Sequence, residues 1–198
     1  MPSRKTLFSL FVIALSTMSP FAYSDEELST AMLGSFNKLI TTFATVEETD
    51  AQRAIVSTVV DFAAITRGVM HKHRAAMSDE QQVQFQTQFE RSLTTLLATA
   101  LAGSQDYTVA IERVRMSEKS PNRAQILGIL TTAKNERFEL LTVAGKNSRG
   151  WLVRNLTING INLGITYRNQ FNELVLKHAG DFDAAIAAWT TSIKESNS

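Results

Sequence analysis

The 198-residue sequence contains no cysteine and only three prolines. Without cysteine there is no disulfide framework, no thiol nucleophile and no cysteine to carry a lipid anchor. The protein must therefore derive its stability from a packed core. The scarcity of proline leaves the first half of the chain almost free of helix breakers.

Long apolar runs are also lacking after the N-terminus. The segment Leu7 to Leu15 is apolar and follows the basic pair Arg4 and Lys5. It is too short to span a bilayer and is typical of a signal peptide. The small residues Ala22 and Ser24 predict cleavage before Asp25. We expect residues 1–24 to be a signal peptide and residues 25–198 to form a single exported domain with a sizeable core.

The sequence has little net charge of either sign. The formal charge is +1 for the whole chain and −1 for residues 25–198. This balance argues against a nucleic-acid binder, whose affinity depends on concentrated Lys and Arg. It also argues against a strong electrostatic hold on an anionic membrane.

Hydrophobic periodicity predicts an α+β fold. Apolar residues at helical spacing predict helices over residues 25–45, 51–74, 78–102, 165–178 and 181–195. Ser78 and Gln81 have the spacing of a capping box, and Gly103 is a stop signal. Alternating patterns predict strands over residues 107–112, 123–132, 137–143 and 151–158. We expect the helical N-terminal half to pack on one face of a four-stranded antiparallel sheet, followed by C-terminal helices.

Signatures of catalysis and metal binding are few. The sequence has no Gly-x-Ser-x-Gly elbow and no Gly-rich phosphate loop. His71 and His73 would point about 200° apart on a helix and could not share a metal ion there. Asp61 or Glu173 could act as a general base in a cone-shaped α+β pocket, so a small-molecule enzyme remains an alternative.

Apolar residues are more distinctive than polar ones. Phe85, Phe89, Leu93 and Leu96 share one helical face, which is typical of core packing. A sheet with helices on one face can also enclose an apolar cavity, and an exported protein without a reaction site is often a carrier. A carrier of a hydrophobic ligand is therefore a further hypothesis.

Two segments resemble signatures of the MlaC family, also called the toluene-tolerance auxiliary family. In residues 59–89 the matching positions are Asp61-Phe62, Arg67-x-Val69-Met70, Ser78-x-Glu80-Gln81, and Phe85 with Phe89. In residues 150–171 they are Trp151, Gly160-Ile161-x-Leu163 and Tyr167-Arg168-x-x-Phe171. The chain departs from the family pattern at Met70-His71, at Arg74 and at Leu97.

The resemblance implies a periplasmic carrier of glycerophospholipid that maintains outer-membrane lipid asymmetry. Its partners would be an outer-membrane lipoprotein–porin complex and an inner-membrane ABC transporter with an MCE-domain subunit. It implies no catalytic residue, no metal and no cofactor. A carrier of another hydrophobic lipid and an adaptor without cargo remain alternatives.

The resemblance also indicates which residues would line an apolar cavity. These candidates are Phe62, Val69, Met70, Phe85, Phe89, Leu93, Trp151, Ile161, Leu163, Tyr167 and Arg168. Arg168 would contact a lipid phosphate or a carboxylate such as Asp61. Core packing is the alternative for Trp151 and Tyr167, and a structural guanidinium is the alternative for Arg168.

Overall fold

The computed structural model describes residues 20–46, 49–102 and 104–195. Most of the predicted signal peptide and the predicted stop signal Gly103 lie outside these residues. The first half contains the helices α1 (Pro20–Thr45), α2 (Thr49–Val59), α3 (Phe62–Met70) and α4 (Asp79–Ala100). Two short 3₁₀ helices, η1 (His71–Ala76) and η2 (Ser104–Asp106), follow α3 and α4.

The second half begins as an antiparallel sheet with strand order β1-β2-β3-β4-β5. Its strands are β1 (Thr108–Ser117), β2 (Ser120–Thr131), β3 (Arg137–Asn147), β4 (Gly150–Ile158) and β5 (Ile161–Asn162). The helices α5 (Leu163–Lys177) and α6 (Phe182–Glu195) complete the described chain. The predicted α+β class is confirmed, with five strands where the sequence predicted four.

The fifth strand arises from a tight turn. Asn159 and Gly160 both have positive φ, at 47° and 83°, and Ile158 pairs with Ile161 on either side. Two such residues make the turn that best matches the twist of a hairpin. The side chain of Asn162 then caps α5 by accepting a hydrogen bond from the backbone N–H of Ile165.

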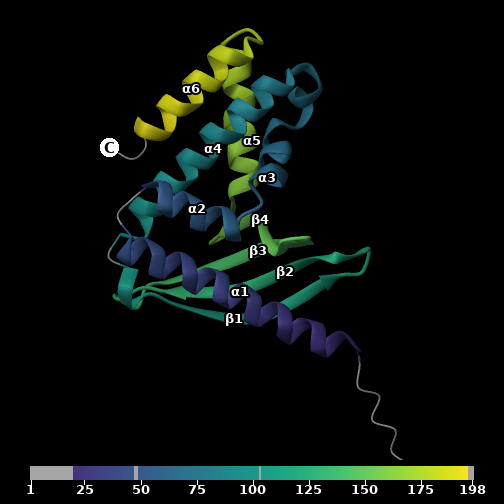
Figure 1. Cartoon of the computed structure of the whole chain (residues 1–198), viewed down its shortest axis with the longest axis vertical. Coiled ribbons are helices and arrows are strands. Elements are labelled where there is room, and N and C mark those ends of the chain that lie inside the picture. Colours follow the sequence, from purple (N-terminus) through teal and green to yellow (C-terminus); the bar gives the residue numbers. More distant parts are fainter. Residues whose placement is uncertain (1–19, 47–48, 103, 196–198) are drawn as a thin grey trace, which may run out of the picture.

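The sheet has two unlike faces. We call the face that bears Val109, Ile126, Leu140 and Ala144 the inner face, because its buried side chains belong to the core or face α1. The outer face bears the alternate positions, with Arg115, Gln125 and Val143 side by side across three strands. Figure 1 shows α1 crossing the sheet, while α3, α5 and α6 stand together beyond it.

The helical region expected over residues 51–74 is divided at residues 60 and 61. Val60 forms an isolated parallel bridge with Val153 of β4, and the backbone N–H of Asp61 donates to the carbonyl of Val153 at 2.9 Å. The Asp61 side chain then caps α3 by accepting from the Ala64 N–H. The break therefore attaches the helical half of the chain to the sheet.

A cluster of aromatic rings fills the space between α4, α5 and α6. Phe85 and Phe89 of α4 lie 5.4 and 5.8 Å from the ring of Trp189, and Phe171 lies 4.4 Å from Phe85. All four residues are buried. Such pairs add to the free energy gained from apolar burial, so this cluster is the core of the helical part.

Candidate functional site

An apolar cavity of about 350 Å³ lies between the sheet and the ends of two helices. One wall is the inner face of the sheet, and the other is formed by the later turns of α1 and the last turn of α4. The lining residues are Phe36, Leu39, Ile40, Leu97, Ala100, Leu101, Tyr107, Val109, Leu130, Thr132, Glu136, Phe138, Leu140, Leu156 and Ile158.

The side-chain periodicity of the helix and of the strands explains why both walls are apolar. Phe36, Leu39 and Ile40 are three and four residues apart, so α1 presents them on one face. In the sheet, Leu140 pairs with Ile158, and both project inward from neighbouring strands. Helix and sheet therefore meet with apolar side chains on both sides of the space.

The short helix η2 joins the ends of α1 and α4. Ser104 is fully buried, and its backbone N–H donates to the carbonyl of Leu101 at 3.1 Å. Its hydroxyl donates to the carbonyl of Ile40 in α1 at 3.5 Å. This connection ties the two helix ends together at the cavity wall.

The polar groups of the cavity come from the loop segments at its edge. Thr132 and Glu136 belong to the β2–β3 turn, where the Glu136 N–H donates to the Thr132 hydroxyl at 3.2 Å. The only ionisable side chains among the lining residues are Tyr107 and Glu136, and no lysine or arginine is among them. The cavity suits an apolar chain and offers no cation to an anion within it.

The eleven residues predicted as cavity lining do not line this cavity. Phe89, Leu93 and Tyr167 lie instead around a much smaller space of about 10 Å³, bounded also by Trp189. That volume is close to one water-sized probe, far below a ligand. The contact of these three side chains with a lipid stays a prediction.

The other predicted residues are distributed over the core and the surface. Phe62, Val69, Met70 and Phe85 are buried in the helical core. Trp151 and Leu163 are half-buried, and Lys146 Nζ lies 5.9 Å from the centre of the Trp151 ring. Ile161 is 62% exposed in β5. Apolar periodicity marks all buried faces alike, so it could not separate interhelical packing from cavity lining.

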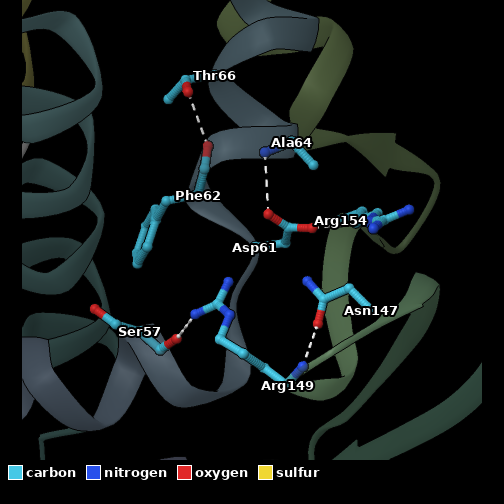
Figure 2. Close-up of polar contacts among 8 residues, drawn as sticks. All are labelled: Ser57, Asp61, Phe62, Ala64, Thr66, Asn147, Arg149 and Arg154. Atoms are coloured by element: carbon cyan, nitrogen blue, oxygen red, sulfur yellow. Dashed lines mark hydrogen bonds and ion pairs between the residues drawn. The ribbon is translucent and has the colours of Figure 1, made fainter. Parts of the chain in front are cut away.

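Arg168 and Asp61 have different partners. Arg168 Nε donates to the carbonyl of Gly68 in α3 at 3.1 Å, so its guanidinium ties α5 to α3. The possible pairing of Arg168 with Asp61 is wrong, because Asp61 accepts from Arg154 Nε of β4 at 3.0 Å. Figure 2 shows Asp61 placed between Ala64 and Arg154.

A second contact lies beside that ion pair, and we call the two together the polar junction. Arg149 Nη1 donates to the carbonyl of Ser57 in α2 at 3.0 Å, and Asn147 accepts from the Arg149 N–H at 2.8 Å (Figure 2). The polar junction joins the corner between α2 and α3 to the β3–β4 hairpin. Its polar groups hold elements together and do not line the 350 Å³ cavity.

The other candidate catalytic and metal-binding residues do not form a common site. His73 Nε2 lies 3.0 Å from Asn172 Oδ1, with its ring against Phe171 and Phe182, and His71 is exposed. Glu173 is exposed on α5. Within the described ranges, no three His, Asp or Glu side chains gather to hold a metal ion, and no helix is long and apolar enough to cross a membrane.

Fold and cavity together define a small α+β domain with an apolar cavity between a sheet and its covering helices. The family model described as MlaC protein matches residues 31–191. Since this match spans most of the sequence, the chain belongs to the MlaC family, as the sequence signatures predicted.

Individual relatives agree with this assignment. The toluene tolerance protein ttg2D of Pseudomonas putida is 29% identical over 146 residues, which are 73% of this chain and 66% of that protein. The match thus spans just under two thirds of the relative's length. In fold, the chain is similar to a phospholipid-binding protein from Ralstonia solanacearum solved in complex with a phospholipid, with a TM-score of 0.70 and 22% identity. The similarity covers 85% of this chain and 96% of that one.

Proposed function

We propose that this protein is a periplasmic phospholipid carrier and that the 350 Å³ cavity takes up an acyl chain. The observation that carries the proposal is a cavity whose walls are aliphatic and aromatic, with polar groups confined to its edge. Membership of the MlaC family and the phospholipid bound to the Ralstonia protein support the same ligand class.

The volume indicates how much of a lipid fits. An apolar cavity of about 150 Å³ holds one benzene molecule, so 350 Å³ holds roughly a dozen carbon atoms. Burying that many methylenes contributes about 10 kcal/mol, at about 0.8 kcal/mol each. This free energy is enough to hold one acyl chain in the cavity.

A glycerophospholipid has two chains with about 30 methylenes in total. Its second chain needs more room than the cavity has, so α1 and the end of α4 must move away from the sheet when both chains enter. Because no lysine or arginine is among the lining residues, we expect the charged head group to stay outside the cavity, in water. One cavity then accepts several head groups.

In the complete transport path, the carrier exchanges lipid between an outer-membrane lipoprotein–porin complex and an inner-membrane ABC transporter with an MCE-domain subunit. This step extends the family resemblance to the present chain. It is tested by following a fluorescent phospholipid between vesicles that contain the two complexes. Transfer that does not depend on the protein would rule out the shuttle.

The cargo is tested by extracting lipid from the purified native protein and measuring it by mass spectrometry. We expect glycerophospholipid at a fixed ratio to protein. The variant Ala100→Phe adds a ring at an exposed lining position and should lower bound lipid at least several-fold while the chain stays folded.

The matched control is Thr95→Phe, which adds a ring at an exposed position on another side of α4. We expect it to leave the lipid content unchanged. Equal lipid content in Ala100→Phe and the unaltered protein would exclude this cavity as the binding site. Absence of lipid from repeated preparations, with none taken up on loading, would exclude the carrier.

A further inference from the structure

Four basic side chains of the sheet region have no partner among the residues that the structure describes. Arg113 and Arg115 of β1, Lys119 of the β1–β2 turn and Arg123 of β2 are all exposed. Within the described part of the chain, none of them forms an ion pair or a side-chain hydrogen bond. Elsewhere on the sheet, Arg137 and Arg154 do pair with carboxylates.

The charge of the chain is segregated between its two parts. Residues 108–158, which form the first four strands, carry nine basic and four acidic side chains. The remainder of residues 25–198 carries nine basic and fifteen acidic side chains. The sheet is thus positive and the helical part negative, although the total is close to zero.

Three of these four cations lie around a cleft of about 490 Å³ at the β1–β2 hairpin, and Arg113 lies outside its wall. In the strand register Arg115 lies opposite Gln125, Ser117 lies opposite Ser120, and Gln125 lies opposite Val143. Arg115, Lys119 and Arg123 line the cleft together with hydroxyl and amide side chains. Glu118 is the one acidic residue in its wall.

The neighbouring part of the outer face is apolar. Leu127, Leu141 and Val143 are half-buried on adjacent strands, next to the arginines. Arginine is enriched at protein interfaces and is among the residues that contribute most to their binding free energy. A guanidinium forms two parallel hydrogen bonds with a carboxylate, so the cleft suits Asp or Glu side chains.

We propose that the β1–β2 hairpin and the adjoining outer face bind an acidic segment of a partner protein, with Arg115 and Arg123 as its carboxylate-binding residues. The concave cleft favours an inserted peptide segment over a flat bilayer surface. The opposite charge of the helical part turns the sheet toward an acidic partner during approach. The proposal does not depend on the cargo of the cavity.

The test uses acetylated hexaglutamate as the probe. Isotope-labelled protein is titrated with the peptide while backbone amide signals are recorded. We expect saturable shifts at residues 113–127 and 141–145, weakening several-fold as salt is raised because the contacts are exposed charges. The variant Arg115→Glu/Arg123→Glu should bind at least 10-fold more weakly. Its milder form, Arg115→Gln/Arg123→Gln, should also lose most of the binding and covers the case in which the reversal impairs folding.

The matched control reverses two exposed cations of the helical part, Lys72→Glu/Arg91→Glu, with the same change in net charge. It should retain binding within about twofold, because salt screens the exposed charges of the helical part from the hairpin. Equal weakening in both reversals, or shifts outside the hairpin, would overturn the proposal. Binding of the hairpin to phosphatidylglycerol vesicles, with no response to hexaglutamate, would overturn it in favour of a membrane surface.

Discussion

Phe89 is a core residue by its contacts. It is 2% exposed, and its ring lies 5.4 Å from Tyr167 and 6.0 Å from Phe85. Phe89→Ala should lower the free energy of unfolding by about 3–5 kcal/mol, because it removes a buried ring and leaves a cavity. Urea unfolding measures this change. Val83→Ala, at a position 65% exposed, is the control and should change stability by less than about 0.5 kcal/mol.

Should Phe89→Ala keep its stability and lose bound lipid, the residue would contact cargo as the sequence predicted. The structure favours loss of folding. The residues that line the 350 Å³ cavity are less completely covered than Phe89. Phe36, Leu39 and Ile40 are each 9% exposed beside that cavity.

Tyr167 gives the protein a specific response to alkaline pH. Desolvation by burial raises the pKa of the Tyr167 phenol. Above about pH 10 the unfolded chain ionises this group while the folded chain keeps it neutral. Stability is therefore complete below pH 10 and is lost as the pH rises through the folded-state pKa.

Urea midpoints between pH 8 and pH 11 measure this loss. Tyr167→Phe should reduce the slope above pH 10, whereas the control Tyr107→Phe should retain it. A slope that is the same in both variants would assign the alkaline instability to other groups.

At the scale of elements, the polar junction attaches α2 and α3 to the sheet. Asp61 is 5% exposed, caps α3 and pairs with Arg154, whose side chain is one third exposed. Asp61→Ala should destabilise the protein by about 2–4 kcal/mol, since it removes a helix cap and leaves a partly buried cation unpaired.

Thermal and urea unfolding check this loss. Asp50→Ala is the control, because the Asp50 side chain is 77% exposed and its ion pair with the half-buried Arg53 should contribute less than about 1 kcal/mol. An equal effect of the two substitutions would mean that the polar junction does not secure α3 to the sheet.

Local signals predicted most elements correctly. The capping box of Ser78 and Gln81 forms as the spacing indicated, and α4 begins at Asp79. The break at Asp61 was missed because it depends on a carbonyl of Val153, which is distant in sequence. The strand β5 was also missed, although Asn159-Gly160 is a strong hairpin signal that could have revealed it.

The cavity was predicted to exist but not to lie where it does. Its lining residues on α1 and on the strands were recognised as apolar faces, as were the faces that pack fully. A cavity arises where two such faces meet without filling the space between them. The space left between the two faces depends on how η2 positions α1 and α4 relative to each other. No local sequence pattern predicts that position.

At the scale of the whole molecule, net charge proved a poor guide to surface charge. The near-neutral total argued against electrostatic attachment, yet the first four strands carry a net charge of +5 and the rest of residues 25–198 a net charge of −6. Opposite charges in separate parts cancel in the sum while each acts on its own surroundings within a Debye length of about 10 Å. The positively charged sheet surface can therefore attract an acidic partner although the total charge is close to zero.

Bound lipid should stabilise the whole fold if the proposed function holds. A ligand that binds the folded state alone raises stability in proportion to the logarithm of its concentration over its Kd. Removing lipid with detergent and refolding should lower the melting temperature by several degrees, measured by calorimetry, and adding phosphatidylethanolamine back should restore it. Ala100→Phe should show a much smaller difference, and an unchanged melting temperature in the unaltered protein would contradict lipid binding at equilibrium.

The connectivity of the sheet also sets an order of folding. The first four strands are joined by short turns, so their pairing needs only the closure of small loops and can form early. The wall of the cavity on α1 must wait for contacts with strands 70 to 120 residues further along the chain. The cavity is thus among the last features to form. A chain interrupted before α1 docks would already have its sheet, yet it would have no closed cavity.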